Sequence, residues 1–119
     1  MLNILMTKRF YGGIFIDRDK LSEQGIDYPI KIEYYKICDN TENKDITQYG
    51  IEVVKTEYKK DDIRIENKEV ERITKEENVI NKILEKLKMN QVTPVTTKYI
   101  VEDMIYNQGE IDKKHCPIV

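Results

Sequence analysis

Polar and apolar residues alternate with a period of two through much of the first half of the chain, which predicts strands. Within residues 28–38, Ile30 and Ile32 alternate with polar neighbours. Such alternation places the apolar side chains on one face of a sheet. Residues 49–60 and 62–73 predict two further strands. Because only a short turn separates these two, we expect them to pair as an antiparallel hairpin.

The second and third predicted strands each contain an irregularity. The alternation changes phase at Val53-Val54. Either a bulge or a strand that is covered on both faces would explain this change. In the third strand, polar residues at Asn67-Lys68 predict an interruption.

A spacing of three and four residues begins after Thr74 and predicts a helix over residues 75–89. Its apolar side chains form one stripe: Val79, Ile80, Ile83, Leu84 and Leu87. Thr74 and Glu77 have the spacing of a capping box, in which each side chain accepts a hydrogen bond from the other residue's backbone amide. The sequence therefore predicts where this helix begins and which side it buries.

A second helix is predicted over residues 97–107. Pro94 is expected to keep it separate from the first, since proline interrupts a helix that would run through it. Gly109 is expected to end it. Residues 110–119 are then expected to be a loose tail.

The N-terminal residues 1–27 allow two interpretations. Gly12-Gly13 lies between two apolar stretches and could form the tight turn of an extra hairpin. The segment could equally be a mobile arm. One helical turn is expected at residues 19–24.

Strands followed by helices predict an α+β fold. We expect an antiparallel sheet of three or more strands, with the helices packed on one of its faces. Residues 1–119 are expected to form a single domain whose core lies within residues 28–109.

Composition limits the classes of partner. The 119 residues are 39% hydrophobic and 35% charged, which allows one folded core. The net charge of -2 gives no overall attraction to nucleic acid or to anionic membranes. Neither a membrane-spanning apolar stretch nor a signal-peptide pattern is present. We therefore expect a cytoplasmic protein that does not bind membranes.

Short stretches of the second half resemble a known group of proteins. These are Tyr49-Gly50-Ile51-Glu52-Val53-Val54, Val92-Thr93-Pro94-Val95-Thr96 and Ile100-Val101-Glu102-Asp103. They resemble an uncharacterised family of small clostridial (Firmicutes) proteins, over about residues 30–107 and without residues 1–27. The resemblance implies a small bacterial cytosolic protein and brings no assigned activity.

Candidate catalytic groups are few. His115-Cys116 has the residue types of a nucleophile and its base, but a tail cannot hold the two side chains in place. Cys38 and Cys116 lack the spacing of a zinc site and are expected to be reduced thiols. Cys116-Pro117-Ile118-Val119 has the outline of a prenylation signal, although valine is not among its usual last residues.

Adjacent carboxylates occur at Asp61-Asp62 and Glu102-Asp103. Neighbouring side chains diverge on a helix, so such pairs do not converge on one substrate atom. We expect a turn at the first pair and a solvated helix face at the second. We therefore assign no catalytic residue, metal site or cofactor, and whether the protein is an enzyme stays uncertain, with the balance against it.

Tyrosines and lysines of the predicted sheet form the one candidate binding face. Its members are Tyr34, Tyr35, Lys36, Lys55 and Tyr58. Such residues can stack bases over a basic surface, and tyrosine is also a good strand former. The sequence favours a small non-catalytic interaction or regulatory module that binds a protein partner or itself. The alternative is single-stranded nucleic-acid binding through the Tyr/Lys face.

Overall fold

The computed structural model describes the backbone of residues 6–40 and 46–115, and side chains as far as residue 107. Within this part of the chain, four strands form one antiparallel sheet in the order β1-β2-β3-β4. The strands are β1 (Met6–Ile16), β2 (Ile30–Asp39), β3 (Gln48–Lys59) and β4 (Asp62–Thr74). Each pairs with the next along the chain, so the sheet is a simple meander.

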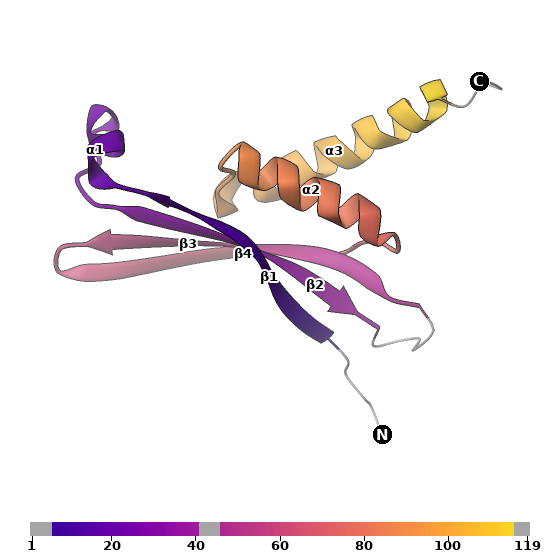
Figure 1. Ribbon diagram of the computed structural model, residues 1–119, viewed down its shortest axis with the longest axis horizontal. Coiled ribbons are helices and arrows are strands. Elements are labelled where there is room, and N and C mark those ends of the chain that lie inside the picture. The colour runs from indigo at the N-terminus through magenta and orange to yellow at the C-terminus, as the bar shows by residue number, and fades with distance from the viewer. Residues whose placement is uncertain (1–5, 41–45, 116–119) are drawn as a thin grey trace.

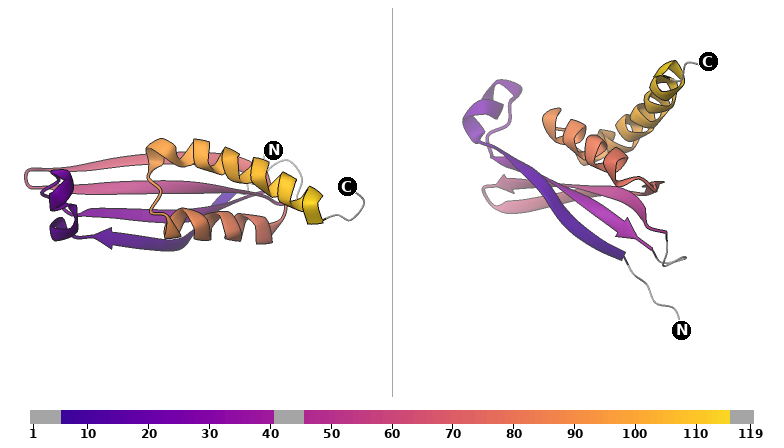
Figure 2. Two further views of the ribbon diagram at one scale, coloured as in Figure 1. Left: turned by 90° about the horizontal axis from the view of Figure 1, so that it is seen from above. Right: turned by 45° about the vertical axis from the view of Figure 1, so that its right-hand side comes forward.

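The helices follow the pattern that the sequence predicts. The elements are α1 (Arg18–Leu21), the 3-10 turn η1 (Ser22–Gln24), α2 (Glu77–Met89) and α3 (Pro94–His115). Figures 1 and 2 show α2 and α3 side by side on one face of the sheet, with α1 at the far end of the strands. The α+β fold with helices packed on one face is confirmed.

The core lies between α2, α3 and the covered face of the sheet. Ile80, Leu84 and Leu87 of α2 are completely buried, as is Val101 of α3. They belong to one cluster with strand residues such as Ile32. Burying each large aliphatic side chain contributes about 1.5–3 kcal/mol. The predicted apolar stripe of the first helix is thus the main contact between the two layers.

One hydrogen bond ties the centre of the sheet to the turn between the helices. Tyr34 is fully buried, and its hydroxyl donates to the backbone carbonyl of Val92 over 2.8 Å. Burial raises the pKa of the Tyr34 phenol well above its ordinary value of 10.0. The phenol therefore stays protonated and keeps its proton in this bond.

The sheet is longer than the helix that covers it. The 12 residues of β3 span about 40 Å at about 3.3 Å per residue. The 13 residues of α2 span only about 20 Å at about 1.5 Å per residue. Figure 2, seen from above, shows the strands continuing beyond the helices towards α1.

Residues 6–16 form one continuous edge strand, so both interpretations of the N-terminus, a hairpin or a mobile arm, are wrong for them. Gly12 lies inside β1, where an added Cβ would be 3.2 Å from the Lys88 side chain. The missing side chain leaves room for the end of the Lys88 side chain at this position. A register shift between Phe10 and Gly12 leaves Tyr11 as an extra residue, and its hydroxyl donates to Glu85 over 2.5 Å.

The helical turn expected at residues 19–24 is confirmed by α1 and η1.

The irregularities of the sheet differ from those predicted. The pairing of β3 is unbroken at Val53-Val54, and β4 continues through Asn67-Lys68. Coverage on both faces does not explain the phase change either, because Val53 is fully buried on the helix side whereas Val54, on the opposite face, is only partly buried. The register shift between β3 and β4 lies instead at Gly50, where β4 bulges with Arg72 at φ 53°.

Both helix boundaries near the predicted caps also differ. Thr74 ends β4 and accepts from the Glu76 amide over 3.0 Å, so Thr74 and Glu77 do not form a capping box. Pro94 is the first residue of α3, a position where its missing N–H costs nothing. The helix continues past Gly109 to His115, so the tail expected from residue 110 is helical as far as the described backbone extends.

We predict that Tyr34→Phe lowers the free energy of unfolding by about 1–2 kcal/mol, since the buried Val92 carbonyl loses its donor while the ring stays in place. Urea denaturation followed by circular dichroism measures this change. Tyr99→Phe is the matched control, because Tyr99 is 73% exposed. An equal effect of the two substitutions would contradict the role given to the buried bond.

A second prediction concerns Gly50. An added Cβ would lie 2.4 Å from the Val70 carbonyl oxygen and 2.9 Å from the Cα of Glu71, both backbone atoms that cannot swing aside. Gly50→Ala should therefore destabilise the protein by about 2 kcal/mol or more, as overpacking does. Gly25→Ala should cost only about 1 kcal/mol, because Gly25 has open space and a positive φ of 77°. Thermal unfolding of the two variants would test this order.

Candidate functional site

The face of the sheet opposite the helices exposes several large apolar side chains. No described helix or strand covers this face, which we call the open face (Figure 1). Strand alternation and cross-strand pairing assign Phe10, Phe15, Ile63 and Ile65 to it. These four side chains are 60–65% exposed. In the register of the sheet, Lys31 and Thr56 lie between Phe15 and Ile65. Several exposed apolar side chains on one uncovered face make this face the candidate interaction surface.

Aromatic contacts order part of the open face. The rings of Phe10 and Tyr35 meet edge to face with centroids 5.6 Å apart, at the middle of β1 and β2. Phe15 and Tyr58 lie 6.5 Å apart nearer the β3–β4 turn. Edge-to-face pairs stabilise one another by about 0.5–1.5 kcal/mol beyond the area they bury. The Phe10–Tyr35 pair has this geometry, whereas the Phe15 and Tyr58 rings are tilted by 44°.

Charged residues of the open face are already paired with one another. The Lys8 ammonium lies 2.7 Å from a carboxylate oxygen of Glu69 and 3.2 Å from one of Glu52. The hydrogen bond that Lys8 donates to Glu69 is the main cause that raises the pKa of Lys8. Lys31 lies 3.7 Å from Glu33, and its pKa is raised mainly by the Tyr58 hydroxyl and then by Glu33. The face therefore presents both signs of charge around its apolar side chains.

The five residues of the predicted binding face lie on both sides of the sheet. Tyr35 and Tyr58 are on the open face. Tyr34, Lys36 and Lys55 point to the helix side, where Tyr34 is fully buried. A single surface cannot contain all five side chains.

Sequence reasoning missed the apolar members of the open face, although a signal was present. Ile63 and Ile65 share one parity along β4, whereas Val70 has the other. Since side chains alternate across a strand, these two groups must face opposite sides of the sheet. Val70 packs against the core cluster, which leaves Ile63 and Ile65 on the open face.

Lys36 joins the sheet to the start of α2. Its ammonium lies 2.8 Å from a Glu77 carboxylate oxygen, and its side chain is only 13% exposed. The hydrogen bond and the charge of Lys36 hold the pKa of Glu77 below its ordinary value of 4.5. Lys36 thus has a structural partner on the covered side of the sheet.

The other candidate residues are not brought together. Cys38 is a partly buried free thiol, Asp61 lies in the β3–β4 turn, and Glu102 and Asp103 are exposed on α3. Only the backbone of His115 is described, and Cys116 lies outside the described residues.

Among described residues, no group of three or more His, Cys, Asp or Glu side chains is placed to hold a metal ion. None of the described helices has the length and apolar character needed to cross a membrane.

Residues 15–107 match the sequence model of a family of unknown function (DUF6514). This stretch covers the end of β1 and every later element as far as most of α3. The chain belongs to this family. The match begins upstream of residue 30, so it includes the last two residues of β1 and the α1 segment, which lie outside the resemblance seen in the sequence. No curated protein and no solved structure matches the chain.

We predict that Lys36→Met raises the pKa of Glu77 towards 4.5, because the variant removes the hydrogen bond and the charge that lower it. A carboxyl-detected NMR titration measures this directly. The ion pair stabilises the folded protein above pH 4.5, and this contribution is lost as pH falls through the folded-state pKa. Lys75→Met, which changes an exposed lysine outside this pair, is the control and should leave the Glu77 titration unchanged.

Proposed function

We propose that this DUF6514 protein is a small non-catalytic interaction module and that its open face binds the open face of a second copy. The exposure of Phe10, Phe15, Ile63 and Ile65 on this one face is the observation that carries this proposal. We also propose that the protein comes from a clostridial bacterium and works in the cytoplasm, as its resemblance to small clostridial proteins implies.

The shape of the open face supports a partner that is itself a sheet. Two sheets pack face to face about 10 Å apart when each presents apolar side chains to the other. Phe10 and Phe15 come from one edge strand, and Ile63 and Ile65 come from the opposite edge. A twofold axis that runs parallel to the strands, between the two sheets, would place β1 of one copy opposite β4 of the other. Phe15 would then lie opposite Ile65.

Charge favours a second copy over a strongly charged partner. The net charge of -2 gives only weak repulsion between two copies. Lys8 and Lys31 are each paired with glutamates on the same face, so two facing copies meet no block of like charge. A polyanion such as nucleic acid would have to compete with these carboxylates for both lysines.

Light scattering and sedimentation over about 10–500 µM test the proposal, a range chosen because weak specific interfaces have micromolar affinity. We expect the wild-type protein to dimerise. Ile65→Lys should shift it to monomer, since the variant places a charge in the apolar interface. Tyr99→Lys is the matched control: it changes an exposed residue of α3, on the other side of the molecule, and should leave the dimer intact.

Other outcomes would replace the second copy by another occupant. A wild-type protein that stays monomeric throughout the range would overturn the proposed self-association. Binding of a labelled single-stranded oligonucleotide that weakens with salt and is lost in Ile65→Lys would assign the face to nucleic acid. Equal loss of the dimer in Ile65→Lys and Tyr99→Lys would place the interface elsewhere.

A further inference from the structure

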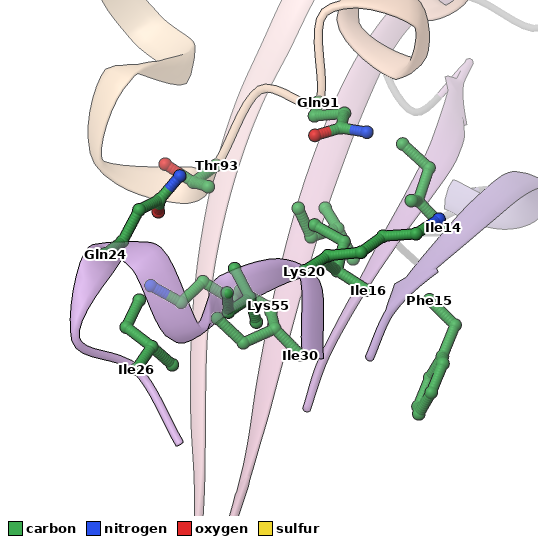
Figure 3. A pocket seen from close by; sticks show the side chains of 12 residues that line it. Ile14, Phe15, Ile16, Lys20, Gln24, Ile26, Ile30, Lys55, Gln91 and Thr93 are labelled. Carbon is green, nitrogen blue, oxygen red and sulfur yellow. The ribbon is translucent and has the colours of Figure 1, made fainter. Parts of the chain in front are cut away.

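A cavity of about 460 Å³ lies on the helix side of the sheet, where the strands extend beyond α2 and α3. Its walls come from the ends of β1 and β2, from α1 and η1, and from the turn that joins α2 to α3 (Figure 3). Figure 2 shows this turn facing α1 across the exposed length of the strands. The volume falls within the range of about 300–1,000 Å³ typical of small-molecule sites.

The floor of the cavity is apolar and continuous with the core. It is formed by Ile14 and Ile16 of β1 and by Ile30 and Ile32 of β2. Ile30 and Ile32 belong to the buried core cluster, so the floor is held by packing on its inner side. The neighbouring Phe15 ring points away from the cavity in Figure 3 and belongs to the open face.

The polar groups around the cavity are cationic or neutral. Lys20 and Lys55 line it, and none of the described lining residues is acidic. Lys20 forms no ion pair with another described residue. Lys55 lies 3.7 Å from Glu57, but that carboxylate also lies 4.0 Å from Arg64 and accepts a hydrogen bond from the Tyr28 hydroxyl. The cavity therefore has two ammonium groups whose local charge is only partly balanced.

The turn between the helices supplies uncharged hydrogen-bonding groups. Gln91 and Thr93 line the cavity on the other side from Ile26 (Figure 3). Gln91 adopts a φ of 52°, a left-handed conformation that glycine or asparagine adopts more easily. This conformation ends α2, because the Gln91 amide donates to the Lys88 carbonyl and the Val92 amide to the Leu87 carbonyl.

We propose that this cavity binds a small carboxylate with an aliphatic body, its tail on the isoleucine floor and its carboxylate at the ammonium group of Lys20, which has no described ion-pair partner, rather than at Lys55, which lies at the other end of the cavity and is paired with Glu57. The size fits such a ligand, because 460 Å³ corresponds to about 15 water molecules at about 30 Å³ each. Octanoate, which is smaller than this volume, is the probe that combines one negative charge with an unbranched apolar chain. The site lies on the other side of the sheet from the open face and does not depend on the proposed dimer.

The experiment is an NMR titration of the full chain with octanoate, observed at isoleucine methyl groups. We expect saturable shifts at Ile14, Ile16 and Ile26, with a dissociation constant below about 1 mM, as for a small ligand in a preformed pocket. Ile63 and Ile65 report on the open face and should not shift. Because octanol has the same chain without the charge, it should bind more weakly than octanoate.

Variants separate the charge from the fold. Lys20→Gln should weaken octanoate binding by about two- to fivefold, as expected for a partly exposed ion pair, and should leave octanol binding unchanged. Lys55→Gln should have a smaller effect on octanoate than Lys20→Gln, since Lys55 is paired with Glu57. Lys75→Gln is the control, since Lys75 is exposed and does not line the cavity. Either absence of saturation by 10 mM, a ceiling chosen about tenfold above the expected constant, or shifts confined to Ile63 and Ile65 would overturn the proposal. So would equal binding of octanoate and octanol that neither lysine variant changes.

Discussion

The structure depends on one contact, the burial of a single helix stripe against a single face of the sheet. Ile80, Leu84 and Leu87 of α2 have no exposed surface, and the Tyr34 hydroxyl fastens the following turn to the middle of β2. This contact fixes the orientation of α2, and the short turn after it places α3 alongside. Because all the helical cover lies on one side, the apolar side chains of the other side stay at the surface.

The two surfaces to which we assign binding follow from this one-sided arrangement. The open face gathers side chains from both edge strands, whereas the cavity lies on the helix side beyond the ends of α2 and α3. Adjacent residues of β1 serve both surfaces: Phe15 faces outward, and Ile14 and Ile16 line the cavity. A ligand in the cavity would therefore contact the strand that also contributes to the open face.

The sequence predicts the layers of this fold well, because alternation and helical spacing are local properties of the chain. The three strands from residue 28 onward, the stripe of α2 and the α+β class are all confirmed. The features that it misses depend on neighbours far along the chain. Gly12-Gly13 predicts a turn, but pairing with β2 keeps both residues inside β1. Pro94 predicts a break between helices, and it is the residue at which α3 begins. The residues of the predicted binding face lie on two sides of the sheet for the same reason. Only the position of the helices shows which alternate residues of each strand are covered.

The mismatch in length between the sheet and its helices has a consequence for cooperativity. We expect the strand amides beneath α2 to exchange with solvent only when the helices and the sheet separate. The ends of β3 and β4 that extend beyond α2 can open separately, at a lower free energy. Ile63, Ile65 and the cavity all lie in this overhanging part. A molecule that binds only the ordered form of this part would, by mass action, lower the population of frayed chains.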